Sequence, residues 1–118
     1  MLERQGRARY GLGVQLRITR RRDFERLLRQ GVRRSVSGYT FYVGRREAGP
    51  ARLGLLISLR HSRKAVQRNA IKRSVREAFR LEQEHLGSVD LLVRPPYEAA
   101  PGREMIACLR RLFPTVGK

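Results

Sequence analysis

Residues 68–80 are the segment whose residue types and spacing most clearly indicate a chemical role. If the segment is helical, its apolar residues fall within an arc of about 100° and would dock on a core. Those residues are Ile71, Val75, Ala78 and Phe79. The residues that fill the adjoining outer arc of about 140° are Arg68, Asn69, Lys72, Arg73, Arg76 and Arg80. Fixed positive charges at helical pitch suit a polyphosphate backbone, because each contact releases condensed counterions.

A solvated charged face without a partner is the alternative interpretation of this helix. Solvated helices mix charges of opposite sign at i,i+4 spacing. Here Arg68, Lys72 and Arg76 are like charges at successive steps of four. Such a row opposes its own folding unless an anion binds it, so the spacing favours nucleic-acid binding. Asn69 fits either an RNA contact or a cap at the start of the helix.

The distribution of charge supports a nucleic-acid partner. The formal net charge is +17, and residues 81–118 are balanced, with five basic and five acidic groups. Residues 1–34 carry eleven arginines against three acids, and residues 52–80 carry nine basic groups against one acid. The positive field therefore belongs to two segments, which the fold brings to one face or separates.

The sequence offers no groups for protein-based catalysis of RNA cleavage. His61 and His85 flank the basic helix and would lie roughly 35 Å apart, too far for an acid–base pair. A two-metal nuclease needs clustered carboxylates, but Glu47 is the only acid between residues 26 and 76. No Cys/His spacing suggests a zinc site. We therefore expect no catalytic residue and no metal ligand, and any chemistry must belong to a partner.

The elements that position the basic helix follow from periodicity and turn signals. Tyr39, Phe41 and Val43 alternate with other residues as in a strand, and the turn at residues 47–50 predicts a hairpin between strands 39–46 and 52–59. Thr19 is expected to cap the first helix, which Gly31 ends. The predicted helices are 21–30, 66–84 and 103–113, and the other predicted strands are 32–36 and 89–94.

This order of elements predicts an α+β fold, a two-layer α/β sandwich with a mixed sheet of about four strands. Strand 52–59, the basic helix and strand 89–94 are expected to form a βαβ unit, for which physical principles favour a right-handed crossover. At 118 residues the chain suits a single domain. We expect residues 1–15 to be a flexible basic arm and residues 16–118 to be one RNA-binding domain.

The sequence predicts a cytoplasmic protein with no membrane contact. The longest apolar run, residues 53–59, covers seven positions, far short of the roughly 20 that span a bilayer. The first residues lack the continuous apolar core of a secretory signal. The single cysteine, Cys108, excludes an intramolecular disulfide, and its apolar neighbours predict a buried small hydrophobe.

The central segment also carries a family resemblance. Arg-Asn-x-x-Lys-Arg-x-x-Arg-Glu-Ala-Phe-Arg at residues 68–80, with Ala65-Val66 and the strand before it, resembles the bacterial ribonuclease P protein component. The similarity extends to Asp23-Phe24 with Gly31 behind it, and to residues 39–43 and 90–94. It covers nearly all of the chain after the first fifteen or so residues. The central motif is specific to this family, whereas the flanking motifs would be weak alone.

The resemblance implies a subunit that works beside a catalytic RNA, with a left-handed βαβ crossover. The holoenzyme would remove the 5′ leader of precursor tRNA, and its RNA subunit would hold the catalytic Mg²⁺, with no metal bound tightly by the protein. The implied partners are ribonuclease P RNA and precursor tRNA, and the protein alone would be monomeric. The residues implied to bind RNA are Arg63, Lys64, Arg68, Asn69, Lys72, Arg73 and Arg76.

Aromatic residues are implied to line a cleft for the single-stranded leader. Phe24 and Tyr42 match the family positions, and the second position on the first helix holds Leu28, which keeps only apolar contact. Aromatic faces stack on unpaired bases without demanding one sequence. Core packing is the alternative for both aromatic residues.

Further departures from the family pattern concern the basic segment and the loop before it. Ala70 replaces a frequent arginine, and the loop at residues 59–64 is about one residue longer than usual and lacks a glycine. A structural RNA-binding protein, such as a ribosomal protein, is the rival from another class. Such a protein has no need of exposed aromatic residues beside the basic helix.

Overall fold

The computed structural model describes residues 16–116. The helices are α2 (Arg21–Gln30), α3 (Ala65–Glu82) and α4 (Arg103–Val116), and the 3-10 turn η2 (Gln83–His85) follows α3. The strands are β1 (Val32–Val36), β2 (Tyr39–Arg45), β3 (Arg52–Leu55) and β4 (Val89–Arg94). The predicted arm, residues 1–15, lies outside the described residues.

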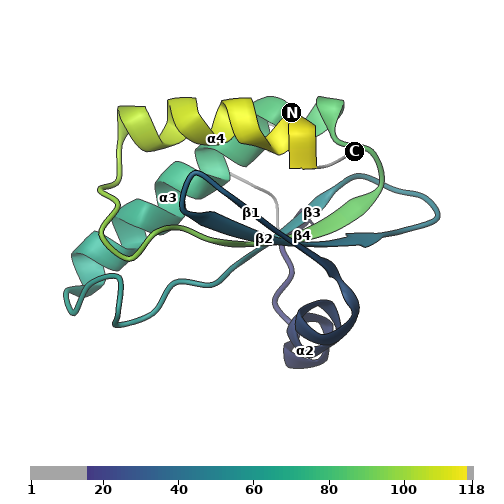
Figure 1. Ribbon diagram of the computed structural model, residues 1–118, viewed down its shortest axis with the longest axis horizontal. Coiled ribbons are helices and arrows are strands. Elements are labelled where there is room, and N and C mark those ends of the chain that lie inside the picture. The colour runs from purple at the N-terminus through teal and green to yellow at the C-terminus, as the bar shows by residue number, and fades with distance from the viewer. Residues whose placement is uncertain (1–15, 117–118) are drawn as a thin grey trace, which may run out of the picture.

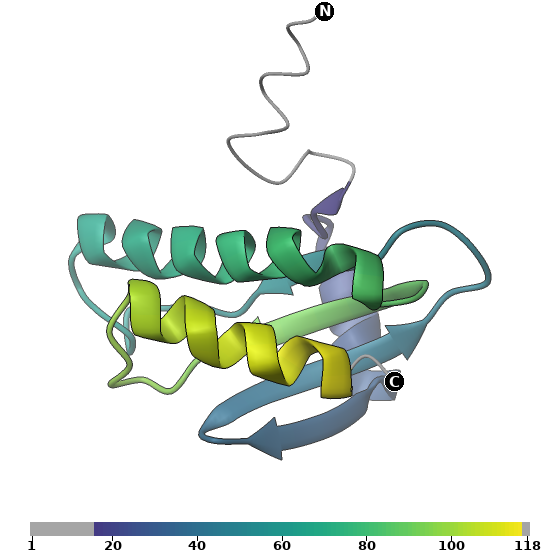
Figure 2. The same ribbon diagram turned by 90° about the horizontal axis from the view of Figure 1, so that it is seen from above.

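The strands form one mixed sheet in the order β1-β2-β4-β3. β2 pairs antiparallel with β1 and β4, whereas β3 and β4 are parallel. Helices α3 and α4 lie side by side over one face, and α2 lies on the opposite face (Figures 1 and 2). The predicted α+β sandwich with a mixed sheet is confirmed, and β3, α3 and β4 form the expected βαβ unit. The left-handed crossover implied by the resemblance stays a prediction.

The predicted hairpin between strands 39–46 and 52–59 is wrong, because β4 lies between β2 and β3. β4 is apolar on both faces: Leu91, Leu92 and Val93 are all fully buried. A strand of this kind is most stable in the middle of a sheet, with a covered surface on each side. The turn at residues 47–50 therefore carries the chain past β4 to the edge of the sheet. β3 also ends at Leu55, earlier than predicted.

The main core lies between the sheet and the helix pair α3/α4. The predicted apolar arc of α3 is confirmed, since Ile71, Val75, Ala78 and Phe79 are all at most 1% exposed. Phe113 of α4 ties three elements together: its ring lies 6.0 Å from Phe41 on β2 and 5.6 Å from Phe79 on α3, edge to face in both cases. Each such ring contributes about 1.5–3 kcal/mol through burial, which fixes α3 on the sheet.

Helix α2 approaches the other face closely, because glycines leave room for it. A Cβ atom on Gly44 would lie 2.6 Å from Cδ2 of Leu27, the buried residue of α2. Leu27 packs with Ile18 and Leu92 into a second, smaller core. Of the described helices, α2 alone lies over this face (Figure 1). We call the part of the face that no described helix covers the open part of the sheet face.

Helix α2 starts without the predicted cap. Arg20, not Thr19, occupies the N-cap position, and no side chain caps the helix. The amides of Asp23 and Phe24 donate to the carbonyl of Arg20 instead. Asp23 places negative charge in the first turn, where it interacts favourably with the positive end of the helix dipole. The predicted bounds of this helix, residues 21–30, are confirmed.

Candidate nucleic-acid interface

The start of α3 concentrates positive charge where a helix favours negative charge. The N-cap is Lys64, and the first turn contains no acidic residue. Arg63 and Lys64 are exposed at this end, and the guanidinium of Arg68 donates to the carbonyl of Ser62 at 3.0 Å. Cations beside the positive end of the helix dipole are unfavourable until an anion joins them. The arrangement suits a phosphate group.

Asn69 does not cap the helix. Because α3 begins at Ala65, Asn69 lies in the second turn with an exposed side chain. The capping interpretation of this residue is therefore wrong. Its amide faces outward among the basic residues, where it can donate to or accept from RNA.

The flanks of α3 place the remaining basic residues in different surroundings. Lys72 and Arg76 line a cleft of about 300 Å³ over the β3 edge, together with Phe24 of α2. Arg73 instead lines a hollow on the α4 side, with Ser74 and Gly102. The structure thus brings Phe24, Lys72 and Arg76 together and leaves Arg73 apart from them.

The surroundings of Arg76 favour the binding of an anion. Partial burial lowers the pKa of its guanidinium, and the nearby charge of Arg17 lowers it further. Within residues 16–116, no carboxylate lies at ion-pair distance from Arg76. A phosphate in the cleft would offset both the desolvation and the repulsion.

Arg17 is a site residue that the sequence interpretation missed. It lines the same cleft, because residues 17–18 run along β3: Arg17 bridges to Leu53, and the Ile18 amide donates to the Leu53 carbonyl at 2.8 Å. Local sequence gave no signal for this pairing, since the single bridge joins segments far apart in the chain.

The three residues predicted to line the leader cleft all lie on the α2 side of the sheet. Phe24 and Tyr42 are partly buried at the rim of the second core, and Leu28 is 46% exposed. Phe24 rests over Gly54, where a Cβ atom would lie 3.0 Å from its Cζ. Tyr39 and Phe41, by contrast, belong to the main core. Phe24 and Tyr42 therefore both pack on the core and keep part of each ring accessible.

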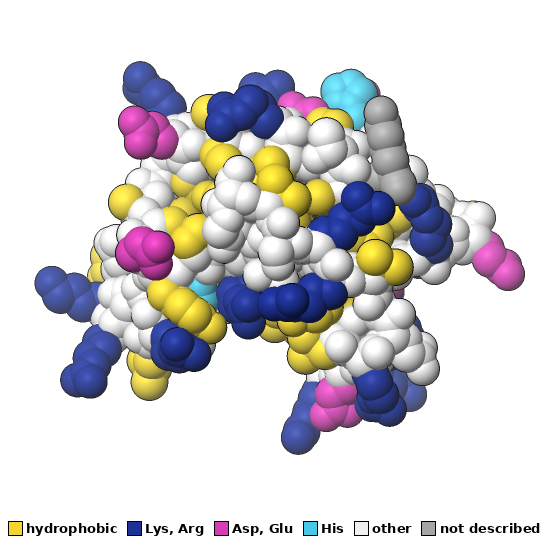
Figure 3. Space-filling view, in the orientation of Figure 1, with side chains coloured by type: hydrophobic (Ala, Val, Ile, Leu, Met, Phe, Trp, Pro, Cys, Tyr) yellow, Lys and Arg dark blue, Asp and Glu magenta, His cyan; other side chains and the backbone are white. Residues whose placement is uncertain are grey.

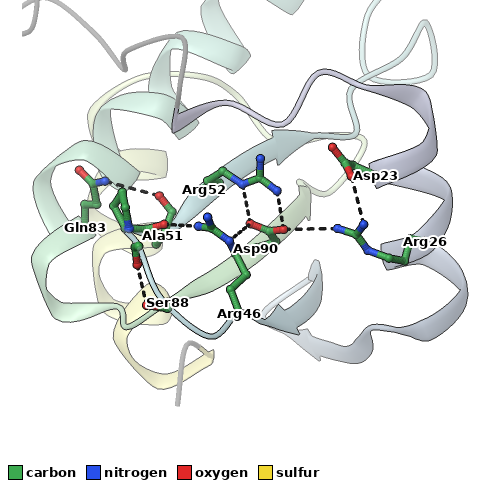
Figure 4. A network of polar contacts seen from close by, with 10 residues as sticks. Asp23, Arg26, Arg46, Ala51, Arg52, Gln83, Ser88 and Asp90 are labelled. Atoms are coloured by element: carbon green, nitrogen blue, oxygen red, sulfur yellow. Dashed lines mark hydrogen bonds and ion pairs between the residues drawn. The ribbon is translucent and has the colours of Figure 1, made fainter.

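A buried carboxylate fixes α2 in its place beside the cleft. Asp90 of β4, whose side chain is 3% exposed, accepts two hydrogen bonds of 2.8 Å from Arg52. Arg26 of α2 reaches the same carboxylate at 3.6 Å and also pairs with Asp23 at 3.2 Å, while Arg46 lies 3.7 Å away (Figure 4). One carboxylate of β4 thus joins α2 to β3 and to the residue that follows β2.

Basic side chains border the open part of the sheet face. In the space-filling view, Lys and Arg groups lie above the hollow beside α2, with few acidic groups near them (Figure 3). The other acidic residues with ion pairs mostly pair within or between helices, as Glu77 does with Arg80 and Glu82 with Arg110. Among residues 16–116, Lys72 and Arg76 of the cleft have no carboxylate at ion-pair distance.

The described residues contain no cluster of side chains that could bind a metal ion. Across residues 16–116 no group of three His, Cys, Asp or Glu side chains could hold a metal ion. His61 is buried before α3, and His85 follows the far end of that helix. In the same part of the chain no helix is long and apolar enough to cross a membrane.

Comparison with known proteins identifies the family of this chain. The sequence model of the family described as Ribonuclease P matches residues 12–117. The ribonuclease P protein component of Thioalkalivibrio sulfidiphilus is 35% identical over 87% of this chain and 88% of its own, and that of Nitrosococcus oceani is 35% identical over 86% and 87%. The solved structure of a Staphylococcus aureus RNase P protein mutant, titled as defective in mRNA degradation activity, superposes with a TM-score of 0.75 at 25% identity, covering 86% of this chain and 87% of the other. The solved structure of the Thermotoga maritima RNase P protein superposes with a TM-score of 0.61 at 26% identity, covering 86% of this chain and 87% of the other.

The fold and the cationic cleft define a small α+β RNA-binding protein. The chain belongs to the ribonuclease P protein family. It is a protein component of the endoribonuclease ribonuclease P, whose role is the 5′ maturation of tRNA, and it partners with ribonuclease P RNA. Family membership decides against the ribosomal-protein alternative.

Proposed function

We propose that α3 docks on ribonuclease P RNA while the cleft between α2, the sheet and α3 holds the 5′ leader of precursor tRNA. The observation that carries this proposal is the cleft itself, which combines the ring of Phe24 with the cations of Lys72 and Arg76. An unpaired nucleotide needs a stacking surface for its base and a cation for its phosphate. The cleft supplies both within one cavity.

Docking on the RNA subunit would use the outer surface of α3 and the loop before it. The residues proposed for this contact are Arg63, Lys64, Arg68, Asn69 and Arg73. The charges of Arg63, Lys64 and Arg68 lie at or just before the start of α3, whose first turn contains no acidic residue. Lys72 and Arg76 would lie between ribonuclease P RNA and precursor tRNA and would screen the repulsion between the phosphates of the two RNAs.

The leader would lie along the open part of the sheet face. Tyr42 is partly exposed on that face, and Leu28 is exposed on α2. Mature tRNA has no unpaired leader, so the cleft would favour substrate over product. We expect the protein to act in the cytoplasm as a monomer until it assembles with the RNA.

Magnesium would be held by the RNA subunit. In support of this proposal, residues 16–116 contain no group of three His, Cys, Asp or Glu side chains that could hold a metal ion. When bound to the RNA, the ions would activate water and stabilise the leaving oxygen. The protein would contribute substrate affinity and charge screening.

Substitutions of Phe24 in the cleft and of Tyr42 on the neighbouring sheet face test the proposal. Phe24→Ala and Tyr42→Ala should each weaken binding of the reconstituted holoenzyme to precursor tRNA by about 1–3 kcal/mol, the worth of one stacking platform. Binding to mature tRNA should not change. Affinities for both RNAs are measured under conditions that prevent cleavage.

A conservative variant separates stacking from packing. Phe24→Leu keeps apolar contact over Gly54 but removes the aromatic face, so it should retain the thermal stability of the protein and still lose precursor affinity. Core packing alone predicts the reverse: early melting of Phe24→Ala and an equal loss for precursor and mature tRNA. That result would remove the leader from this cleft.

A further inference from the structure

A hollow of about 420 Å³ lies on the α4 side of α3, whereas the cleft that holds Lys72 and Arg76 lies on the other flank of this helix. The two helices lie side by side and begin at the same end of the helix layer (Figure 2). Residues of α3 at helical spacing form one wall of the hollow, and the chain at the start of α4 forms the other. Its volume suits a small ligand or a single nucleotide, since binding pockets occupy about 300–1,000 Å³.

The walls of this hollow offer apolar contact. Ala70 contributes it from α3, and Pro101 and Ile106 contribute it from the α4 side. The family pattern frequently has arginine where this chain has Ala70, and the short side chain leaves the space open. All three residues are half-buried, so a flat ring that entered the hollow would cover apolar surface that now faces water.

Ser74 fixes the two walls of the hollow relative to each other. Its Oγ donates to the carbonyl of Ala70 at 3.0 Å and accepts from the amide of Gly102 at 2.9 Å. Gly102 has a φ of 125°, a conformation that residues with a side chain rarely adopt, and a Cβ atom there would meet nothing within 4 Å. The hollow is therefore formed before a ligand binds, which reduces the entropy lost on binding.

The charges around the hollow suit a phosphate group. Arg73 lines the hollow and is exposed, and among residues 16–116 no carboxylate lies within ion-pair distance of it. Glu77 lines the same hollow, but its two oxygens accept from Arg80 at 3.1 and 2.7 Å, so its charge is compensated. A phosphate can therefore bind Arg73 while the base attached to it contacts the apolar walls.

We propose that the hollow holds one unpaired nucleotide of ribonuclease P RNA, with its base against Ala70, Pro101 and Ile106 and its phosphate on Arg73. The occupant is this RNA because the hollow adjoins the outer surface of α3, which the proposed function docks on it. The inference rests on that docking and adds a contact that depends on the shape of one nucleotide rather than on charge alone. Such a contact selects one position in the fold of the RNA, because only an unpaired base can leave its stack and enter a pocket.

Ala70→Leu tests the hollow by filling it without changing any charge. The variant should bind ribonuclease P RNA about fivefold to a hundredfold more weakly than the unsubstituted protein, and the salt slope of binding should not change. Arg73→Gln should weaken binding and also lower the salt slope by about 0.7–0.9. Ala107→Leu, which adds the same atoms at an exposed position of α4, is the matched control and should bind normally. Normal binding by Ala70→Leu would overturn the proposal.

Chemical probing of the bases of full-length ribonuclease P RNA gives a readout that a loss of protein stability would not reproduce. At protein concentrations that saturate the RNA, one unpaired nucleotide should be protected at its base by the unsubstituted protein and by Ala107→Leu. The same nucleotide should regain its reactivity with Ala70→Leu, while the rest of the protected pattern stays. Identical protection by Ala70→Leu and the unsubstituted protein would refute the pocket, whatever their affinities.

Arg68→Glu, measured in parallel, distinguishes failure of this inference from failure of the proposed function. If Arg68→Glu weakens binding of the RNA and Ala70→Leu does not, the pocket is refuted and the docking of α3 stands. If neither variant weakens binding, the docking of α3 fails and the pocket fails with it. Arg73→Gln decides the matter if Ala70→Leu unfolds, since Arg73 is exposed: normal binding and unchanged base protection with this variant would refute the pocket.

Discussion

Asp90→Asn should strongly destabilise the protein and loosen its leader cleft, although Asp90 contacts no RNA in either proposal. The substitution keeps the shape of the side chain but removes the carboxylate charge that pairs with Arg52. It leaves Arg26 and Arg46 close to the Arg52 guanidinium. Breaking a fully buried ion pair costs about 3–5 kcal/mol. The side chains of Arg52, Arg46 and Arg26 are 25%, 29% and 49% exposed, so they can turn partly to water. We therefore expect a loss of about 2–4 kcal/mol in the free energy of unfolding.

The assay is urea unfolding together with a thermal melt. A loss of this size should lower the melting midpoint by ~10–20 °C in a domain of about 100 residues. Added salt should narrow the difference from the unsubstituted protein, because it screens the repulsion among the three arginines. Glu98→Gln, which removes an exposed carboxylate, should leave stability unchanged. Asp90→Asn should also weaken binding of precursor tRNA more than mature tRNA, since α2 carries Phe24.

A double-mutant cycle with Arg52→Gln can refute this reasoning. The two residues share two short hydrogen bonds, so the coupling free energy should be large, between about 0.5 and 3 kcal/mol. A coupling free energy near zero, or a loss below about 1 kcal/mol for Asp90→Asn alone, would show that the network does not hold α2 in place.

Other substitutions test the interface, the close approach of α2 and the core. Arg68→Glu or Lys72→Glu should each reduce the salt slope of binding to ribonuclease P RNA by about 0.7–0.9 in a salt titration; an unchanged slope would assign the contact to another surface. Gly54→Ala should cost about 1–3 kcal/mol in urea unfolding and lower precursor affinity, because its Cβ would lie 2.5 Å from Leu92 and 3.0 Å from Phe24. Burial, with a smaller effect from Cys108, raises the pKa of Tyr39 to about 12. Keeping this phenol neutral contributes stability that is fully present below pH ~10, the ordinary pKa of tyrosine. This contribution is lost as the pH rises through about 12, the pKa of Tyr39 in the folded protein. Between these pH values the free energy of unfolding of Tyr39→Phe should therefore fall less than that of the unsubstituted protein. Equal losses in the two proteins would contradict the raised pKa of Tyr39.

The sequence predicted the helices and most strand bounds because their signals are local. The apolar arc of α3 and the alternation at Tyr39, Phe41 and Val43 depend only on near neighbours. The pairing of strands is not local, and the turn at residues 47–50 resembles that of a hairpin. Only the presence of apolar residues on both faces of β4 indicated that this strand belongs in the centre.

The candidate site was partly predictable for the same reason. Helical spacing placed Lys72 and Arg76 on one flank of α3, and the family pattern singled out Phe24. No pattern in the sequence showed that these three residues share a cleft with Arg17. The hollow between Ala70 and Pro101 was equally hidden, since it joins residues far apart in the chain that meet only after α4 packs beside α3.

The bridge between Arg17 and Leu53 has a practical consequence for anyone who labels this protein. It holds the beginning of the described chain against β3, and Arg17 itself lines the cleft with Lys72 and Arg76. An affinity tag or fluorophore placed close before this segment would enter the molecule at its RNA-facing side. α4 ends over the opposite face of the sheet (Figure 1), which makes its end the better attachment point for surface immobilisation or dye labelling in binding experiments.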